Sequence, residues 1–212
     1  MVSNILRRGV YLITEHERLG FAQLLSIAEI VLPAGIAALQ YRNKTAGPAQ
    51  QRVEAAQLQS LCKRFDVPFI VNDDPGLALE LEADGVHLGR EDRDCREARL
   101  RLGADRLVGI SCYNDLARAD EAVAQEASYI AFGAMFPTTT KTNTVSAPAG
   151  LICEAKQRYR VPIVAIGGIT PENCLPVIEA GVDLLAVVSS VWLAADPLKA
   201  INTFNQLMAI QT

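Results

Sequence analysis

Short apolar runs recur along the 212-residue chain, and each is followed by a segment whose apolar residues have helical spacing. The runs are hydrophobic throughout rather than alternating, which is typical of strands covered on both faces. We expect strands at 10–14, 36–41, 69–71, 86–88, 107–111, 129–132, 163–166 and 184–188. We expect helices at 21–32, 48–63, 93–102, 116–126, 148–159, 171–180 and 197–208, with a short one between the third and fourth strands.

This regular alternation predicts an α/β fold, a single (β/α)8 TIM barrel that occupies residues 1–212 as one domain. A doubly wound open sheet is the alternative. It is disfavoured because no Gly-x-Gly-x-x-Gly follows the first strand and because the eight units are evenly distributed.

Composition narrows the class of partner. The net charge is −4, without a basic patch, so we expect no nucleic acid partner. We expect no membrane partner either, because no apolar stretch reaches the length of a spanning helix and the first residues lack a signal core. The five cysteines are scattered and form no Cys-x-x-Cys, so we interpret them as reduced core thiols of a cytoplasmic protein.

Acidic residues follow the third and fourth expected strands, within residues 68–92. Asn72 and Asp73 end one strand, and Asp92 comes shortly after the other. The same ends of parallel strands lie on one rim, so these oxygens suit Mg²⁺ shared with a substrate phosphate. The alternative is helix capping, which fits Asp74 before Pro75 and also Asp94.

A second polar group ends the second strand. Gln40, Arg42 and Lys44 alternate, so an extended backbone would point all three to one side. Arginine and lysine at this position favour anion binding. A solvated basic loop is the alternative.

Further polar groups follow the last three strands. The loop after the sixth expected strand contains Thr138, Thr140 and Lys141. Their hydroxyls and ammonium could bind phosphate, and the alternative is a plain surface turn. Gly167–Gly168 and Ser189–Ser190 end the seventh and eighth strands, where such barrels often bind phosphate. A plain tight turn is the alternative there.

The sequence shows no evident general base or nucleophile. His16 falls in a polar turn, where solvation is the default, and His87 lies within a strand, where a packed, hydrogen-bonded histidine is expected. We interpret Cys112, near the end of the fifth strand, as an inert thiol. The candidates are therefore several anion-binding groups and a metal site. Such a set favours electrostatic stabilisation of a phosphorylated leaving group over covalent catalysis.

Taken together, these motifs resemble the thiamine-phosphate synthase family over nearly the whole chain. The motifs that carry the resemblance are Gln40-x-Arg42-x-Lys44, Val71-Asn72-Asp73-Asp74, Val86-His87-Leu88-Gly89-x-x-Asp92, Gly109-Ile110-Ser111, Phe132-Gly133 through Pro137-Thr138-x-Thr140-Lys141, Ala147-Pro148-x-Gly150-Leu151, Ile166-Gly167-Gly168-Ile169 and Val187-Val188-Ser189. The chain departs from the family at Ala134-Met135, where Met135 would narrow the thiazole side of the site.

The resemblance implies a transferase that joins a pyrimidine diphosphate to a thiazole phosphate by a dissociative route, in which pyrophosphate leaves first. It implies that Mg²⁺ is held by Asp73 and Asp92, and that Ser111, Lys141 and Arg42 act at the reacting centre. It assigns the pyrimidine diphosphate to Gln40, Arg42, Lys44, Asn72 and Lys141, and the thiazole phosphate to Thr138, Thr140, Gly168, Val188 and Ser189.

Three rival functions remain to be separated from this one. A thiazole tautomerase would lack the diphosphate and metal residues, which this chain has. A catalytically silent regulator on the same barrel stays open, whereas a phosphosugar isomerase would need a base that the sequence does not show. The sequence also leaves open whether the protein is a homo-oligomer.

Overall fold

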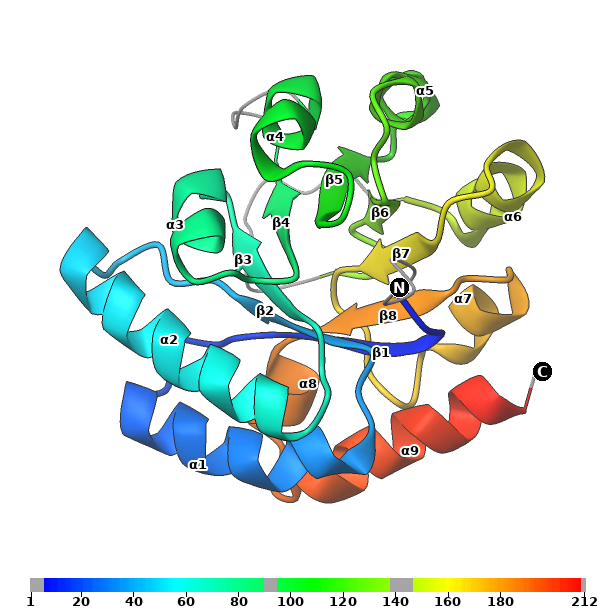
Figure 1. The fold of residues 1–212 in the computed structure, drawn as a ribbon. Coiled ribbons are helices and arrows are strands. Elements are labelled where there is room, and N and C mark those ends of the chain that lie inside the picture. Colours follow the sequence, from blue (N-terminus) through cyan, green and yellow to red (C-terminus); the bar gives the residue numbers. More distant parts are fainter. Residues whose placement is uncertain (1–5, 90–94, 138–146, 211–212) are drawn as a thin grey trace.

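A computed structural model describes residues 6–89, 95–137 and 147–210, which form a closed barrel of parallel strands inside a ring of helices (Figure 1). The strands are β1 (Gly9–Ile13), β2 (Ala38–Tyr41), β3 (Phe69–Asn72), β4 (Gly85–Leu88), β5 (Leu107–Tyr113), β6 (Tyr129–Gly133), β7 (Ile163–Ile166) and β8 (Leu184–Val187). Each strand pairs with the next, and β1 pairs with β8 to close the barrel. The predicted (β/α)8 barrel is therefore confirmed, and the open sheet is excluded.

The helices follow the strands in the expected order. They are α1 (Phe21–Val31) with the 3-10 turn η1 (Leu32–Ala34), α2 (Pro48–Arg64), α3 (Pro75–Glu80), α4 (Cys95–Leu102), α5 (Leu116–Ala124), α6 (Ala149–Arg158), α7 (Leu175–Glu179), α8 (Ser189–Trp192) and α9 (Pro197–Ala209). None of the helices in the described ranges is long and apolar enough to cross a membrane.

Local sequence explains where several helices begin. The Asp74 side chain accepts hydrogen bonds from the backbone N–H groups of Gly76 and Leu77, and Pro75 is the first residue of α3. The predicted cap is thus confirmed. Asp115 and Asp196 cap α5 and α9 in the same way. Each cap satisfies N–H groups that have no partner within the helix.

The hydrophobic core has two parts. The larger part lies between the strands and the helices, and the smaller part fills the barrel interior. The interior cluster combines two tyrosines, Tyr11 and Tyr129, with several small residues, including Ala38, Ala131 and Ala186. Two of these alanines, Ala131 and Ala186, also line a cavity at one end of the barrel. Small side chains therefore leave space where larger ones would fill the interior.

Two elements after the seventh and eighth strands differ from the prediction. Helix α7 begins at Leu175 rather than at 171, because Asn173 bonds back to the backbone of Gly168 and Thr170 and holds that segment in a turn. The four-residue helix α8 was not expected. Its last residue, Trp192, is buried and donates its indole N–H to the Ile13 carbonyl at 2.6 Å, which ties α8 to β1.

The prediction that all five cysteines are core thiols is wrong for one of them. All five are free, but Cys153 is exposed, whereas Cys62, Cys95, Cys112 and Cys174 are buried. Burial raises the pKa of Cys112 to about 12, which keeps this thiol protonated and supports its inert interpretation.

Candidate active site

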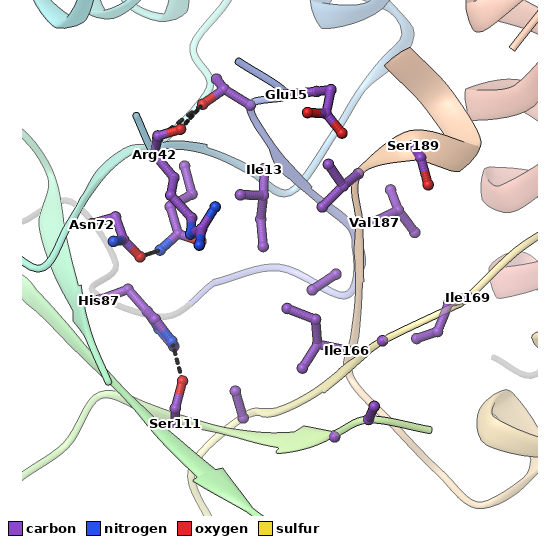
Figure 2. Close-up of a pocket in the computed structure, with 18 of the residues that line it drawn as sticks. Ile13, Glu15, Arg42, Asn72, His87, Ser111, Ile166, Ile169, Val187 and Ser189 are labelled. Atoms are coloured by element: carbon purple, nitrogen blue, oxygen red, sulfur yellow. Dashed lines mark hydrogen bonds between the residues drawn. The ribbon is translucent and has the colours of Figure 1, made fainter. Parts of the chain in front are cut away.

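A cavity of about 730 Å³ opens at the carboxyl ends of the strands, and every strand or the loop after it contributes to its lining. This is the end at which TIM-barrel enzymes carry their active sites. The predicted residues that line it are Gln40, Arg42, Lys44, Asn72, Asp73, Ser111, Gly168, Val188 and Ser189. In Figure 2, Arg42 and Asn72 lie on one side of the cavity, and Ile169 and Ser189 lie on the other.

Two amides form a pair between neighbouring strands. Gln40 Nε2 donates to Asn72 Oδ1 at 2.9 Å, and Gln40 is only 2% exposed. Gln40, Arg42 and Lys44 all line the cavity, as their alternation predicted. Because each amide is held by the other, the pair presents a fixed set of hydrogen-bonding groups to the cavity.

The backbone of Arg42 is fixed by Thr14. The Thr14 hydroxyl accepts from the Arg42 N–H at 2.8 Å and donates to the Arg42 carbonyl at 3.1 Å. The Arg42 side chain is about a quarter exposed, and its guanidinium lies 4.0 Å from the Glu17 carboxylate. A strand end held in this way projects a permanent positive charge into the cavity.

Lys44 and Asp73 form an ion pair at the rim, with 2.8 Å between Lys44 Nζ and Asp73 Oδ2. Asp73 has a φ of +62°, and its N–H donates to the His87 carbonyl at 2.8 Å. The left-handed conformation thus lets the backbone stay bonded to β4 while Asp73 lines the cavity.

The structure describes one half of the predicted metal pair, because Asp92 lies outside the described residues, as do Thr138, Thr140 and Lys141. Within 6–89, 95–137 and 147–210, no group of three or more His, Cys, Asp or Glu side chains could hold a metal ion. Proteins commonly bind Mg²⁺ through one or two carboxylates together with substrate phosphates, and a carboxylate at the cavity rim fits that pattern.

His87 connects the cavity with the barrel interior. Its Nε2 lies 2.9 Å from Ser111 Oγ, as Figure 2 shows, and its Nδ1 lies 3.2 Å from the Tyr129 hydroxyl. Tyr129 in turn contacts the Tyr11 hydroxyl at 2.8 Å. Burial raises the pKa of both tyrosines, so both are neutral phenols. The expected packed, hydrogen-bonded histidine is confirmed, and it also lines the cavity.

The expectation that His16 is solvated is wrong. Its side chain is 6% exposed, and its Nδ1 lies 3.2 Å from Asn43 Nδ2 and 3.7 Å from Glu54 Oε2. The ring stacks on Phe21 and meets the edge of Tyr41. Burial lowers the pKa of His16, although Glu54 and Glu15 oppose this shift. The reason for the error is that its partner Glu54 lies on α2, far along the sequence.

Sequence reasoning also missed Glu15. It is 3% exposed, lines the cavity and accepts the Glu17 N–H through one carboxylate oxygen. Its other oxygen is buried without a hydrogen-bond partner in the described part of the chain. Its place directly after the first strand was the signal that could have found it, because the carboxyl ends of barrel strands carry the functional groups.

The loops after β7 and β8 border the far side of the cavity. Gly168 has a φ of +63°, and a Cβ there would lie 2.4 Å from the Pro137 carbonyl oxygen. Only glycine therefore allows this loop to approach the segment after β6 so closely. The expected effect of Met135 on the cavity is not found. Met135 is buried in the core and is not among the residues that line the cavity.

A closed barrel with a polar, charge-bearing cavity at the carboxyl ends of its strands defines the class: a TIM-barrel protein with the site architecture of an enzyme. The family model described as thiamine monophosphate synthase matches residues 10–191. The chain belongs to this family.

Individual relatives agree with the family match over nearly the whole chain. The thiamine-phosphate synthase of Azoarcus sp. (strain BH72) is 50% identical over 202 residues, which cover 95% of this chain and 98% of that one. The thiamine-phosphate synthase of Methylobacillus flagellatus is 46% identical, with 94% and 95% covered. The solved thiamine phosphate pyrophosphorylase from Pyrococcus furiosus is 30% identical, covers 97% of each chain and has a TM-score of 0.85.

Proposed function

We propose that the protein is a thiamine-phosphate synthase. It joins 4-amino-2-methyl-5-hydroxymethylpyrimidine diphosphate to 4-methyl-5-(2-phosphoethyl)thiazole and releases pyrophosphate. The observation that carries the proposal is the division of the cavity. The amide pair lies on β2 and β3, and the charged groups Arg42, Lys44 and Asp73 follow these two strands. Ile169 and Ser189, from the loops after β7 and β8, lie across the cavity from Arg42 and Asn72. Near-full-length identity with synthases supports the same assignment.

The charged side of the cavity suits the diphosphate substrate. The paired amides of Gln40 and Asn72 can bind the polar edge of an aminopyrimidine, while Arg42 and Lys44 bind the diphosphate. Lys141, which lies outside the described residues, would add a further cation on the leaving group. Gly168, Val188 and Ser189 would border the thiazole phosphate, together with Thr138 and Thr140.

The reaction exchanges one bond for another. The pyrimidine methylene C–O bond breaks first, and its electron pair leaves with pyrophosphate. The thiazole nitrogen then donates its lone pair to the methylene carbon and forms the new C–N bond. The substitution needs no proton transfer at the reacting carbon, which is consistent with a site rich in anion-binding groups. Charge stabilisation of the leaving group by Arg42, Lys44, Lys141 and Ser111 is the main contribution of the protein.

Mg²⁺ belongs to this proposal. Asp73, together with Asp92, would hold it, and bound Mg²⁺ would neutralise charge on the diphosphate. The Lys44 ammonium balances the Asp73 carboxylate in the structure described. Charged groups for both a metal and a diphosphate distinguish the synthase from a thiazole tautomerase, which would lack them. A cytoplasmic location, in keeping with the five free cysteines, is a further part of the proposal.

The test is a direct assay with both substrates and Mg²⁺, in which thiamine phosphate and pyrophosphate are measured together. We expect equal amounts of both products, and their loss with a chelator. The Asp73→Asn variant should need much more Mg²⁺, and its backbone is preserved because asparagine tolerates positive φ. Asp74→Asn is the matched control, since it removes the same charge one residue away and keeps the helix cap.

Two results would contradict the proposal. Folded wild-type protein that forms no thiamine phosphate with both substrates and Mg²⁺ would exclude the synthase assignment. An Asp73→Asn variant with the same Mg²⁺ dependence as Asp74→Asn would exclude Asp73 as a ligand and leave the synthase assignment in place.

A further inference from the structure

Four side chains form a continuous hydrogen-bonded chain from the cavity into the barrel interior. Ser111 Oγ contacts His87 Nε2 at 2.9 Å, His87 Nδ1 contacts the Tyr129 hydroxyl at 3.2 Å, and Tyr129 contacts the Tyr11 hydroxyl at 2.8 Å. The four residues come from β5, β4, β6 and β1. Ser111 and His87 line the cavity, whereas the two tyrosines belong to the interior core cluster.

The interior is shaped to hold this chain. Tyr11 is 2% exposed and Tyr129 is fully buried. Gly109 lies opposite His87 in the β4–β5 pairing, and a Cβ at this glycine would lie 1.9 Å from Tyr129 Cζ. The missing side chain therefore provides the space that the phenol ring occupies. The Tyr129 ring also stacks on the imidazole, with 5.6 Å between centroids and 22° between planes.

Counting hydrogens sets the direction of the chain. With a neutral imidazole, the four groups carry four polar hydrogens for three links, so one hydrogen is left over at an end. Among the described residues the Tyr11 hydroxyl has Tyr129 as its hydrogen-bond partner. If the leftover hydrogen were on Tyr11, a buried donor would have no acceptor, which is unfavourable. If it is on Ser111, it points into the open cavity, where water or a ligand accepts it.

This direction determines the tautomer of His87. Tyr11 donates to Tyr129, Tyr129 donates to Nδ1, and the imidazole hydrogen is then on Nε2, which donates to Ser111 Oγ.

We propose that Tyr11 and Tyr129 are positioning residues that hold His87 as its Nε2–H tautomer, so that the Ser111 hydroxyl donates its hydrogen to an anionic oxygen in the cavity. The identity of that anion, the substrate diphosphate, rests on the proposed function. In the opposite direction, Ser111 would donate to His87 and present only lone pairs to the cavity, which would repel an anion.

The first test reads the tautomer directly in the protein without substrates. Histidine labelled with ¹⁵N gives two ring systems, since the chain has two histidines, and a His16→Gln variant assigns them. We expect the His87 Nε2 shift of a protonated nitrogen and the Nδ1 shift of an unprotonated one. Tyr129→Phe removes the donor to Nδ1 and should produce a mixture of tautomers. Tyr11→Phe, the second variant, should produce a smaller change of the same kind.

Two NMR results would overturn the proposal. One is a wild-type His87 with its hydrogen on Nδ1. The other is a Tyr129→Phe variant, folded as judged by its other resonances, that keeps the wild-type tautomer. Neither result depends on synthase activity, so a failure of the proposed function is distinguishable from a failure of this inference.

The second test is kinetic. Tyr129→Phe should lower kcat/KM about tenfold, the loss expected for one hydrogen bond to a charged group. In a Ser111→Ala background the same substitution should have no further effect, because Tyr129 acts through Ser111. Tyr41→Phe is the matched control. It removes another buried phenol hydroxyl, bonded to Glu54, and should leave kcat/KM unchanged. Equal losses from Tyr129→Phe in both backgrounds would overturn the proposal.

Discussion

The two histidines of the chain lie in polar networks of different design. His87 belongs to a linear chain that begins on the buried Tyr11 and ends at Ser111 in the cavity. His16 belongs to a cluster that converges on the buried Glu54, which accepts from Tyr41, Asn43 and Gln50. A chain with a donor left over at its open end is suited to bind a ligand. A cluster whose donors converge on one carboxylate is suited to hold β2 and α2 together.

This comparison predicts that changes in the Glu54 cluster alter stability, and that changes in the His87 chain also alter activity.

The largest effect is expected for Glu54→Ala. It leaves the buried donors of Tyr41 and Asn43 without their acceptor, so the free energy of unfolding should fall by about 3 kcal/mol. Urea denaturation measures the fall, and kcat/KM well below the melting temperature should be unchanged. Glu80→Ala is the control, because Glu80 forms an exposed pair with Arg52, and its loss should have a much smaller effect. Similar losses for both variants would contradict a structural role for the cluster.

Gly109→Ala should reduce both stability and activity. The added methyl overlaps the Tyr129 ring, and overpacking of this kind costs about 2 kcal/mol. Because Tyr129 must move away from His87, kcat/KM should fall in parallel, unlike in Glu54→Ala. The control is Gly150→Ala in α6, because a Cβ at this position would meet nothing within 4 Å. This substitution should raise stability, since alanine favours the helix more than glycine does. A Gly109→Ala variant with full activity would show that catalysis does not depend on the position of Tyr129.

His16 should make the protein less stable in mild acid. Burial lowers the pKa of His16 in the folded state below the usual value of 6.5, so the unfolded chain binds a proton first as the pH falls. Stability should therefore be constant above about pH 6.5 and decline below it. Melting temperatures measured from pH 7.5 to 5 should fall less in His16→Gln than in the wild type. Equal declines would show that other groups cause the acid sensitivity.

Local signals in the sequence were sufficient for most of the fold. The strand at 163–166 and the Asp74 cap were predicted correctly, because apolar runs and capping residues act on their immediate neighbours. Helix α8 was missed, because four residues are too few to show a helical period.

The site was only partly accessible from sequence. A search for polar residues at the ends of the expected strands identified several groups that line the cavity, including Arg42 and Ser111. It could not find the contacts that orient them, because Tyr11 and Tyr129 are 118 residues apart and no local pattern links them. The same limit explains the error at His16, whose partner Glu54 lies on another element.

The smallest effect on stability is expected for Lys44→Met. The Lys44 side chain is 57% exposed, and exposed ion pairs contribute little, so the free energy of unfolding should change by less than about 0.5 kcal/mol. Its ammonium instead balances Asp73 at the rim, and in the function proposed here it binds the diphosphate. We therefore expect a higher KM for the pyrimidine diphosphate, with the increase becoming smaller at high salt as screening weakens the wild-type interaction. A large loss of stability with an unchanged KM would place Lys44 with Glu54, among the residues that hold the fold, rather than with the groups that bind the substrate.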